Sequence, residues 1–488
     1  MTPASTFLRS DPLFRNATRY VTSGALMFDL AAADPNDSHH SFQQSYRQRR
    51  TAAAIVLCLT GTGMATVRAL AQAGVDVHAF VFRPHEPIQH SRYARKVNVG
   101  HLADDDDELI RYLLAYAKQF ATPPVVVPTS DKHALLLAKH RARLRERCRI
   151  WRNTHEDLSR LINKDALYDA AQRAGVPVIP SIFDANPVEI AAWSTLNSPP
   201  YLLKPPFEGA PSSPVHAKNI QLHTREALLE FLQQHGSQGL IVQRLMHGGD
   251  GHIYDCYGLS TAGRRLVGMA SHRRLRQHSP DFGATCFGEI PSGLPPAQDR
   301  RLFEYTKRLL AALPYHGIFG VEWLHERGSD RFYLIDFNAR PFASIGHLHD
   351  CGVNLPWLSY RDLLGDELDD VDARPQVKRK LWIDFGRDVE TFRAKRSRGE
   401  LTTWQWLCSL ARCRSFAYFD SRDLGPGIAS MHNMLQHAIR FAKARLPRRK
   451  PVARAPQGVQ IANRPRCSDL RSGWIVNSNA RSASAAGA

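Results

Sequence analysis

The chain has 488 residues, which is too long for one ordinary hydrophobic core, so two or three packed units are expected. Hydrophobic residues make up 43% of it, a content typical of a globular protein and too high for a wholly disordered one. The formal net charge of +18 is compatible with nucleic acid, an anionic membrane surface or anionic substrates such as nucleotides.

Half of the excess charge lies near the C-terminus. Between Arg440 and Arg471 there are ten Lys or Arg residues against one acid, Asp469. We expect residues 441–488 to form a basic, disordered tail, with a phosphate- or membrane-binding arm as the minor alternative. No nucleic-acid partner is expected.

The eight cysteines are scattered, with no Cys-x-x-Cys pair and no His spacing suited to zinc. They are typical of reduced thiols in a cytosolic protein. We find neither a signal-peptide pattern nor an apolar run of about 18 residues, so a cytoplasmic location is predicted.

Residues 1–50 are polar and irregular, and we expect a disordered N-terminal extension there. Residues 51–150 predict a Rossmann-like domain: a strand over 53–59, a turn with Gly61 and Gly63, a helix ending at Gly74, a strand over 75–82, and a third strand in "PPVVVPTSD". The glycine pattern lacks a third Gly and a closing acid, which makes it weak support for NAD.

Beyond residue 150 the pattern changes. "LINKDALYDAAQRAGVPVIPS" begins with a helix, "PYLLKPPF", "GLIVQRLM" and "RRLVGMAS" predict strands, and "TREALLEFLQQH" predicts a helix that Thr224 caps. Strands and helices do not alternate strictly, so an α+β unit with antiparallel sheets is favoured for residues 151–370.

"GIFGVEWLH" and "RFYLIDFNAR" flank the polar loop "ERGSD" and predict a hairpin. If residues 327–331 form its turn, Glu322 lies opposite Asp336. Asn338 and Arg340 then share the face of these acids, while the other face packs through Tyr333, Ile335 and Phe337. A turn shifted by one residue would break the pairing.

Two carboxylates directly across a strand pair repel each other unless one is protonated or a cation lies between them. Asn338 adds a hard oxygen ligand, and this donor set suits Mg²⁺ shared with phosphate. Arg340 lies one step further, within reach of the same phosphate or of a developing oxyanion. The alternative is a solvated hairpin edge with an Asp336–Arg340 ion pair.

The order of these motifs resembles the ATP-grasp enzymes, firmly over residues 160–345. The resemblance implies that Lys164 and Lys204 bind ATP phosphates and that Glu322, Asp336 and Asn338 bind Mg²⁺. It further implies that the hinge over the adenine consists of Gln243, Arg244, Leu245 and Met246.

Within "SHRRLRQHSPDFGATCFGE", the Arg-Leu-Arg-Gln core resembles a segment of ATP-grasp proteins related to carboxylate–amine ligases. The resemblance implies that Arg276 and Arg340 stabilise charge at the acyl phosphate. The sequence departs from the family in two places: "EGAPSSPVHAKN" has one glycine where many members carry a Gly-rich loop, and Asp336 replaces the more common Glu.

The weaker candidates lie outside these motifs. "HLHD", with His347, His349 and Asp350, favours a substrate-facing or structural role over metal binding. Ser130 and Asp131 end a strand of the leading domain, where substrate contact and a helix cap are equal alternatives. Trp404 and Trp406 predict an amphipathic helix in a helical accessory region at 371–440, which favours an interdomain contact over a membrane anchor.

The resemblance implies α/β plus α+β: a Rossmann-like pre-ATP-grasp domain followed by a two-lobed ATP-grasp domain with antiparallel sheets. It implies an ATP- and Mg²⁺-dependent ligase that joins a small-molecule carboxylate to an amine. The alternatives are a carboxylase or carboxylate–thiol ligase using the same ATP site, and a non-catalytic nucleotide-binding protein tethered by its tail.

Overall fold

The computed structural model describes residues 52–205, 219–246, 248–280, 283–368, 375 and 379–445. The predicted N-terminal extension, most of the basic tail and the segment "EGAPSSPVHAKN", except its last residue Asn219, lie outside them. The chain divides into a unit of Met1–Leu435 and a unit of Gln436–Ala488. Of the second unit, only the end of one helix is described.

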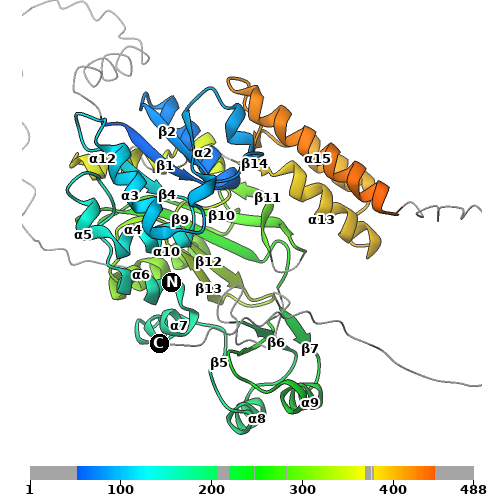
Figure 1. The fold of residues 1–488 in the computed structure, drawn as a ribbon. Helices are drawn as coiled ribbons and strands as arrows, with labels where there is room; N and C mark the ends of the chain where they lie inside the picture. The colour runs from blue at the N-terminus through cyan, green and yellow to red at the C-terminus, as the bar shows by residue number, and fades with distance from the viewer. Residues whose placement is uncertain are drawn as a thin grey trace, which may run out of the picture. The chain divides into compact units, whose positions relative to one another are not determined.

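A four-stranded parallel sheet opens the described chain (Figure 1). Its strand order is β3-β2-β1-β4, and every residue of β1 is buried, which explains the unbroken apolar run. The expected open α/β domain is confirmed, but the sequence analysis missed β3, a polar and mostly exposed edge strand. The elements are β1 (Ala54–Cys58), α2 (Thr60–Gln72), β2 (Val77–Val81), η1 (Pro87–His90), β3 (Arg95–Asn98), η2 (Gly100–Leu102), α3 (Asp106–Ala117), β4 (Val125–Pro128), α4 (Asp131–Lys139) and α5 (Arg141–Leu144).

The glycines of "GTGMAT" lie inside helix α2, not in a turn before it. The helix starts at Thr60, so Gly61 and Gly63 occupy its first turn. A Cβ on Gly63 would lie 2.9 Å from the Cα of Cys58, closer than van der Waals contact permits. Gly63 therefore lets α2 pack closely against β1. This close packing is a sufficient reason for a glycine at position 63, and no nucleotide-binding role is needed to account for it.

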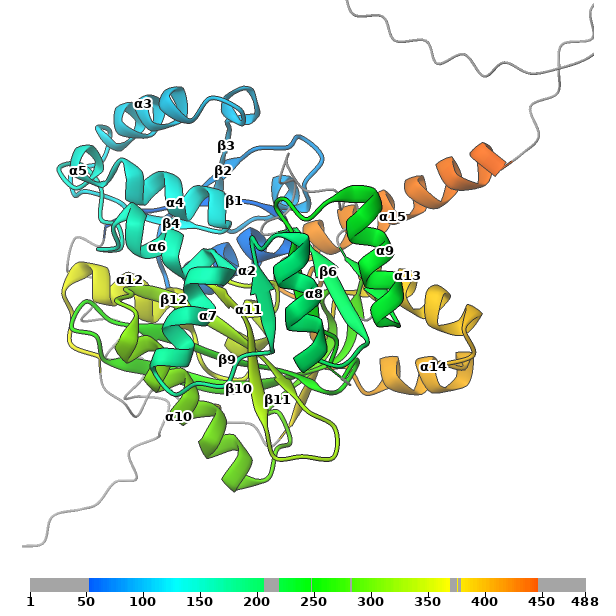
Figure 2. The same cartoon turned by 90° about the horizontal axis from the view of Figure 1, so that it is seen from below.

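A second, antiparallel sheet has the order β5-β8-β6-β7, with helices α8 and α9 on one face (Figures 1 and 2). Ile190, Leu228 and Leu232 join these helices to the sheet in one apolar cluster. Thr224 caps α9 as predicted, because its hydroxyl accepts a hydrogen bond from the Ala227 amide. The elements are α6 (His155–Ile162), α7 (Lys164–Arg173), β5 (Ser181–Phe183), α8 (Pro187–Leu196), β6 (Tyr201–Lys204), β7 (Ile220–Leu222), α9 (Arg225–His235) and β8 (Ile241–Arg244).

The largest sheet has seven strands in the order β13-β12-β9-β10-β11-β14-β15. All its pairs are antiparallel except β14 with β15, which confirms the expected antiparallel architecture. Helix α12 connects this part to the leading domain, since the Tyr360 hydroxyl donates to the Ala52 carbonyl. The elements are β9 (Ile253–Ser260), β10 (Leu266–His278), β11 (Ala284–Ile290), α10 (Pro296–Ala312), β12 (Gly317–His325), β13 (Phe332–Asn338), α11 (Ile345–Asp350) and α12 (Leu355–Leu364).

The C-terminal region, predicted as helical, also completes the large sheet. Strand β14 pairs with β11, and β15 pairs with β14. In helix α14, Trp406 is stacked on Phe392, whereas Trp404 is exposed. No helix of the described residues is long and apolar enough to cross a membrane. The elements are β14 (Lys380–Ile383), α13 (Phe385–Ser397), α14 (Thr403–Ala411), β15 (Ser415–Phe416) and α15 (Leu424–Arg445).

Candidate active site

The β12–β13 hairpin pairs Glu322 with Asp336, as the sequence predicted. The loop length and the strand register that produce this pairing differ from the prediction. His325 pairs with Phe332, so the loop spans residues 326–331 and is one residue longer than assumed. A bulge then leaves Ile335 unpaired between Leu334 and Asp336. The extra strand residue compensates for the longer loop and restores the predicted register.

The bulge also changes which residues face the core. The prediction that Tyr333, Ile335 and Phe337 share the packing face is wrong. The main core contains Phe332, Leu334 and Phe337 instead. Tyr333 and Ile335 pack on a separate small cluster of Ile179, Met246, Ile253 and Leu324. One inserted residue breaks the two-residue alternation, so the core positions on either side of the bulge are three apart.

The acidic pair belongs to a row of polar residues across four strands. His272 pairs with Asp255 between β10 and β9, Asp255 pairs with Glu322 between β9 and β12, and Glu322 pairs with Asp336. Opposed residues of antiparallel strands lie on the same face, so the four side chains share one surface of the sheet. Of the four residues, only Glu322 and Asp336 were predicted from the sequence as site residues.

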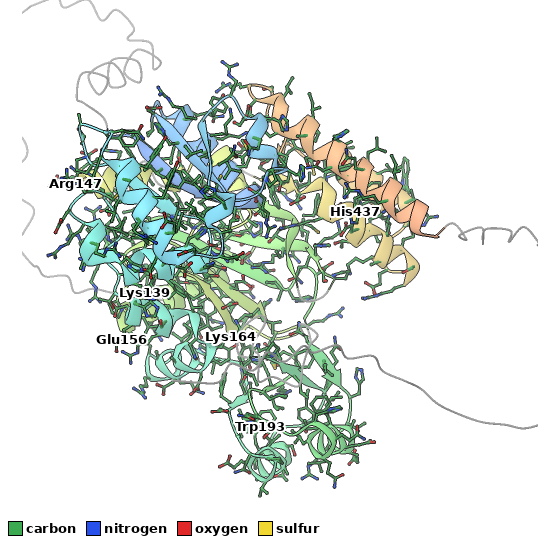
Figure 3. All side chains as sticks on the ribbon, viewed as in Figure 1. Lys139, Arg147, Glu156, Lys164, Trp193 and His437 are labelled. Atoms are coloured by element: carbon green, nitrogen blue, oxygen red, sulfur yellow. The ribbon has the colours of Figure 1, made fainter. Side chains whose placement is uncertain are left out.

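Each carboxylate of the pair has its own cation. The Lys164 Nζ lies 2.7 Å from the Asp336 Oδ2, and Figure 3 shows Lys164 where α7 approaches β13. The Arg274 Nη2 lies 2.7 Å from the Glu322 Oε1, which also accepts a hydrogen bond from the Asn338 amide at 2.9 Å. Two positive side chains therefore relieve the repulsion that suggested a metal.

Burial and charge compete at Asp336. Burial alone raises the pKa of this carboxyl, but Lys164 outweighs it and holds the pKa below its ordinary value. For Lys164, burial lowers the pKa, and the neighbouring Asp336 raises it above the usual value. Both groups are thus ionised near neutral pH.

Asp255 anchors the other end of the row. It is buried and binds Arg274 at 2.5 Å and His272 at 2.8 Å. Burial raises its pKa, while Arg274 and His272 hold the pKa below its ordinary value. Arg274 thus bridges Asp255 and Glu322, and this bridge fixes the position of Glu322 beside the hairpin pair.

Lys204, at the end of β6, is buried, and its Nζ donates to an amide oxygen, the Gln243 Oε1, at 3.0 Å. Burial and the nearby Lys164 lower its pKa to about 7, while Asp336 opposes this shift. Gln243 in turn donates to Ser181 and Tyr168. Lys204 is therefore held in place next to a second cation, where an anionic group would favour its charged form.

The four predicted hinge residues follow one another at the end of β8. Gln243 points into the polar cluster with Lys204, and Arg244 is exposed. The Leu245 amide donates to the Pro200 carbonyl, and Met246 packs in the cluster with Leu324. These residues lie next to the strand that carries Lys204.

Arg276 does not reach the acidic pair. Its guanidinium forms two hydrogen bonds to Asp388 of α13, at 2.6 and 2.9 Å, and stacks over the Phe287 ring. The pairing of β10 with β11 is irregular between Arg274 and Arg276. This irregularity explains why two arginines only two residues apart serve different partners.

The Arg276–Asp388 pair gives a stability prediction. Both side chains are buried, so Asp388→Asn should lower the free energy of unfolding by about 3–5 kcal/mol, because it leaves the Arg276 charge without a counterion. Glu390→Gln is the matched control, an exposed acid on the same helix. Urea denaturation measures both variants. Equal stability of the two would contradict the assignment of Arg276 to a structural pair.

Arg340 lies at the boundary with the leading domain. Its Nε and Nη2 each lie 3.1 Å from a carboxylate oxygen of Asp131, so the alternative Asp336–Arg340 pair is not formed. Ser130 caps helix α4 by accepting from the His133 amide. Arg340 and Asp131 thus bring the end of the hairpin to the carboxyl edge of the parallel sheet.

The "HLHD" residues make contacts within the fold. The His347 ring bonds the Lys380 carbonyl, His349 bonds Gln72, and Asp350 accepts from Ser415. Among the residues that the structure describes, no group of three or more His, Cys, Asp and Glu side chains is arranged to hold a metal. These contacts agree with a structural role, one of the two roles that the sequence favoured over metal binding.

No protein-family model and no curated protein matches the sequence. Solved structures do match. Carboxyaminoimidazole ribonucleotide synthase from Aspergillus clavatus, complexed with ATP, is 15% identical at a TM-score of 0.52 and covers 68% of this chain and 81% of its own. N5-carboxyaminoimidazole synthetase from Staphylococcus aureus, complexed with ADP, is 12% identical at a TM-score of 0.55, over 71% of this chain and 86% of its own.

The biotin carboxylase domain of the Hydrogenobacter thermophilus 2-oxoglutarate carboxylase, in complex with MgADP, ADP and bicarbonate, is 14% identical at a TM-score of 0.52 and covers 67% of this chain and 73% of its own. The protein has the ATP-grasp fold. At these identities the likeness establishes the fold alone.

Within the ATP-grasp fold, sequence reasoning missed Asp255, His272 and Arg274. A signal for Asp255 was present, since it is the one acid in the apolar strand "IYDCYGLS". Arg274 was visible in "HRRLR", but its register against β9 was not. Both residues become significant only when the strands are paired.

Proposed function

We propose that this protein is an ATP- and Mg²⁺-dependent ligase that activates a carboxylate as an acyl phosphate and joins it to an amine. One observation carries the proposal: Lys164 and Lys204, from separate elements, meet the Glu322–Asp336 hairpin in one polar site of an ATP-grasp fold. The ATP, ADP and MgADP named for the similar structures support nucleotide binding here.

The hairpin residues fit Mg²⁺. Glu322, Asp336 and Asn338 offer two carboxylates and one amide oxygen on neighbouring strands, and Mg²⁺ prefers such hard oxygen ligands, usually completed by phosphate and water. When bound, the ion would supply positive charge to the phosphate oxygens. Asp336 stands where many ATP-grasp enzymes carry the longer Glu. Both side chains offer carboxylate oxygens to a metal.

The positive side chains have three roles in this proposal. Lys164 and Lys204 bind the ATP phosphates, and Lys204 gains a proton as it does so, because its pKa near 7 rises next to an anion. Arg274 acts as a positioning residue, since it holds Glu322 against Asp255. Arg340 lies at the edge shared with the leading domain, where we place the second substrate.

The reaction then proceeds in two displacements. A carboxylate oxygen attacks the γ-phosphorus of ATP and ADP leaves, which gives an acyl phosphate. The amine nitrogen attacks the acyl carbon and loses a proton. Phosphate leaves with the oxygen that came from the carboxylate and takes up that proton. Fixed positive charge around the phosphates lowers the barrier of the first step.

The experiment traces the carboxylate oxygen that is transferred to phosphate. Purified protein is incubated with ATP, Mg²⁺, an amine panel and carboxylates labelled with heavy oxygen, bicarbonate included. We expect ADP release that depends on both substrates, and labelled oxygen in the released phosphate. If the wild-type protein neither binds Mg-ATP nor releases ADP in a Lys204-dependent manner, the ligase proposal fails.

We also propose a cytoplasmic location and the domain boundaries that the sequence suggested. The seven described cysteines are free thiols, and six of them are buried, as is typical of a reducing compartment. Antibody detection after cell fractionation tests the location, and limited proteolysis near residues 150 and 370 tests the boundaries.

A further inference from the structure

A cavity of about 220 Å³ lies between the leading domain and helix α12. None of its lining residues belongs to the site around Glu322 and Lys204. Four of them are arginines from one short stretch of the chain, "RARLRERCRIWR", and we call this space the arginine cavity. Its lining includes Arg141, Arg145, Arg149, Arg152, His316 and Asp362.

The positive charge of the arginine cavity is not balanced by the protein. Asp362 is its one acidic lining residue, and this carboxylate is occupied: the His316 Nε2 lies 2.6 Å away and the Ala262 amide donates to it. The His316 Nδ1 accepts from the Arg152 amide, so the Nε2 carries the proton given to Asp362. Across the described residues, no carboxylate lies within ion-pairing distance of the four arginines.

One donor in this lining is also unsatisfied. The Arg149 Nε is buried without a hydrogen-bond partner, while its Nη1 donates to the Leu363 carbonyl at 3.2 Å. A buried, charged donor without an acceptor is costly, and four like charges around one space add repulsion. A bound anion would remove both penalties.

Size and geometry restrict the anion. The cavity is smaller than the roughly 300–1,000 Å³ of sites for drug-sized ligands, so a small molecule fits better than a whole nucleotide. The planar guanidinium group presents paired donors that match phosphate oxygens. We propose that the arginine cavity binds a small phosphate-bearing anion, either inorganic phosphate or a compact phosphate ester.

The location gives such binding a structural effect. Arg141, Arg145 and Arg149 belong to the leading domain, whereas Ala262, Asp362 and Leu363 belong to the turn after β9 and to α12. An anion held by the arginines would therefore lie against both parts of the fold. The site is independent of the proposed ligase chemistry, which uses none of these residues.

Calorimetric titration of the full chain tests the proposal, with inorganic phosphate and glycerol phosphate as separate probes and sodium chloride at matched ionic strength. The test variant is Arg145→Gln/Arg152→Gln, two exposed lining residues. The matched control is Arg143→Gln/Arg147→Gln, which removes two exposed charges from the same stretch outside the lining. Arg147 lies at the periphery in Figure 3.

We expect the wild type and the control to bind one or both probes, and the test variant to bind at least about tenfold more weakly, because it loses charge-assisted hydrogen bonds. The stronger of the two probes identifies the source of the phosphate group. Lys204→Met should keep this binding. No binding by the wild type, equal weakening in the two arginine variants, or loss of binding in Lys204→Met would each overturn the proposal.

Discussion

Replacement of Lys204 by methionine is expected to lower ATP-dependent turnover at least about a hundredfold, since a fixed cation at the transferring phosphate contributes several kcal/mol to transition-state stabilisation. Methionine keeps the length of the buried chain and removes its charge. Because burial disfavours the charged lysine, the variant should be as stable as the wild type or more so. Steady-state ADP release and thermal unfolding measure the two effects.

Lys307→Met is the control for this variant, because Lys307 is an exposed lysine paired with Glu304. It should turn over at the wild-type rate. Full activity of Lys204→Met would show that Lys204 has no role in ATP-dependent turnover. Unfolding of that variant would contradict the predicted stability.

The lowered pKa of Lys204 also predicts a pH dependence. Its pKa is about 7 in the free protein, below the ordinary value of 10.5, and a bound phosphate group would raise it again. Above pH 7, nucleotide binding should therefore take up a proton, and the affinity for ATP should fall as the pH rises. Titration calorimetry in buffers of different ionisation heat measures the uptake, which Lys204→Met should abolish.

The second large effect is expected at Glu322. Glu322→Gln keeps an oxygen for the Asn338 amide but removes the charge shared with Arg274. If the hairpin holds Mg²⁺, this variant should lose most of the Mg²⁺ dependence of nucleotide binding and about a hundredfold or more in turnover. Nucleotide affinity measured with and without Mg²⁺ separates the two losses.

Glu326→Gln, in the hairpin loop, provides the matched control, since it removes an acid from the same hairpin outside the polar row. It should respond to Mg²⁺ as the wild type does. A Glu322→Gln protein with an unchanged Mg²⁺ response would exclude this acid from the metal site.

Features determined by short stretches of chain were predictable from the sequence. The Thr224 cap depends on one hydroxyl and an amide three residues later, and the β1 strand depends on one apolar run. The β3 strand was missed because Arg95 and its neighbours are polar, and only pairing with β2 makes them a strand.

Features that depend on pairing irregularities were not predictable. Arg274 and Arg276 look equivalent in "HRRLR". Because the pairing of β10 with β11 is irregular between them, Arg274 pairs with Asp255 and Arg276 pairs with Asp388. The Glu322–Asp336 register was predicted from a loop one residue too short, and the bulge at Ile335 made the result correct. The bulge lies at an ordinary apolar strand residue, so the residue types alone did not indicate it.

The bulge separates the tip of the hairpin from its base. The bulge lies between the loop and Asp336, so the outer pairs from His325 to Trp323 follow one register and the inner pairs from Glu322 to Gly320 another. A change of one residue in loop length can thus be absorbed before it reaches the acids. Related chains can vary in hairpin length there while keeping the two carboxylates face to face, and alignments that allow no gap at Ile335 will misplace one of them.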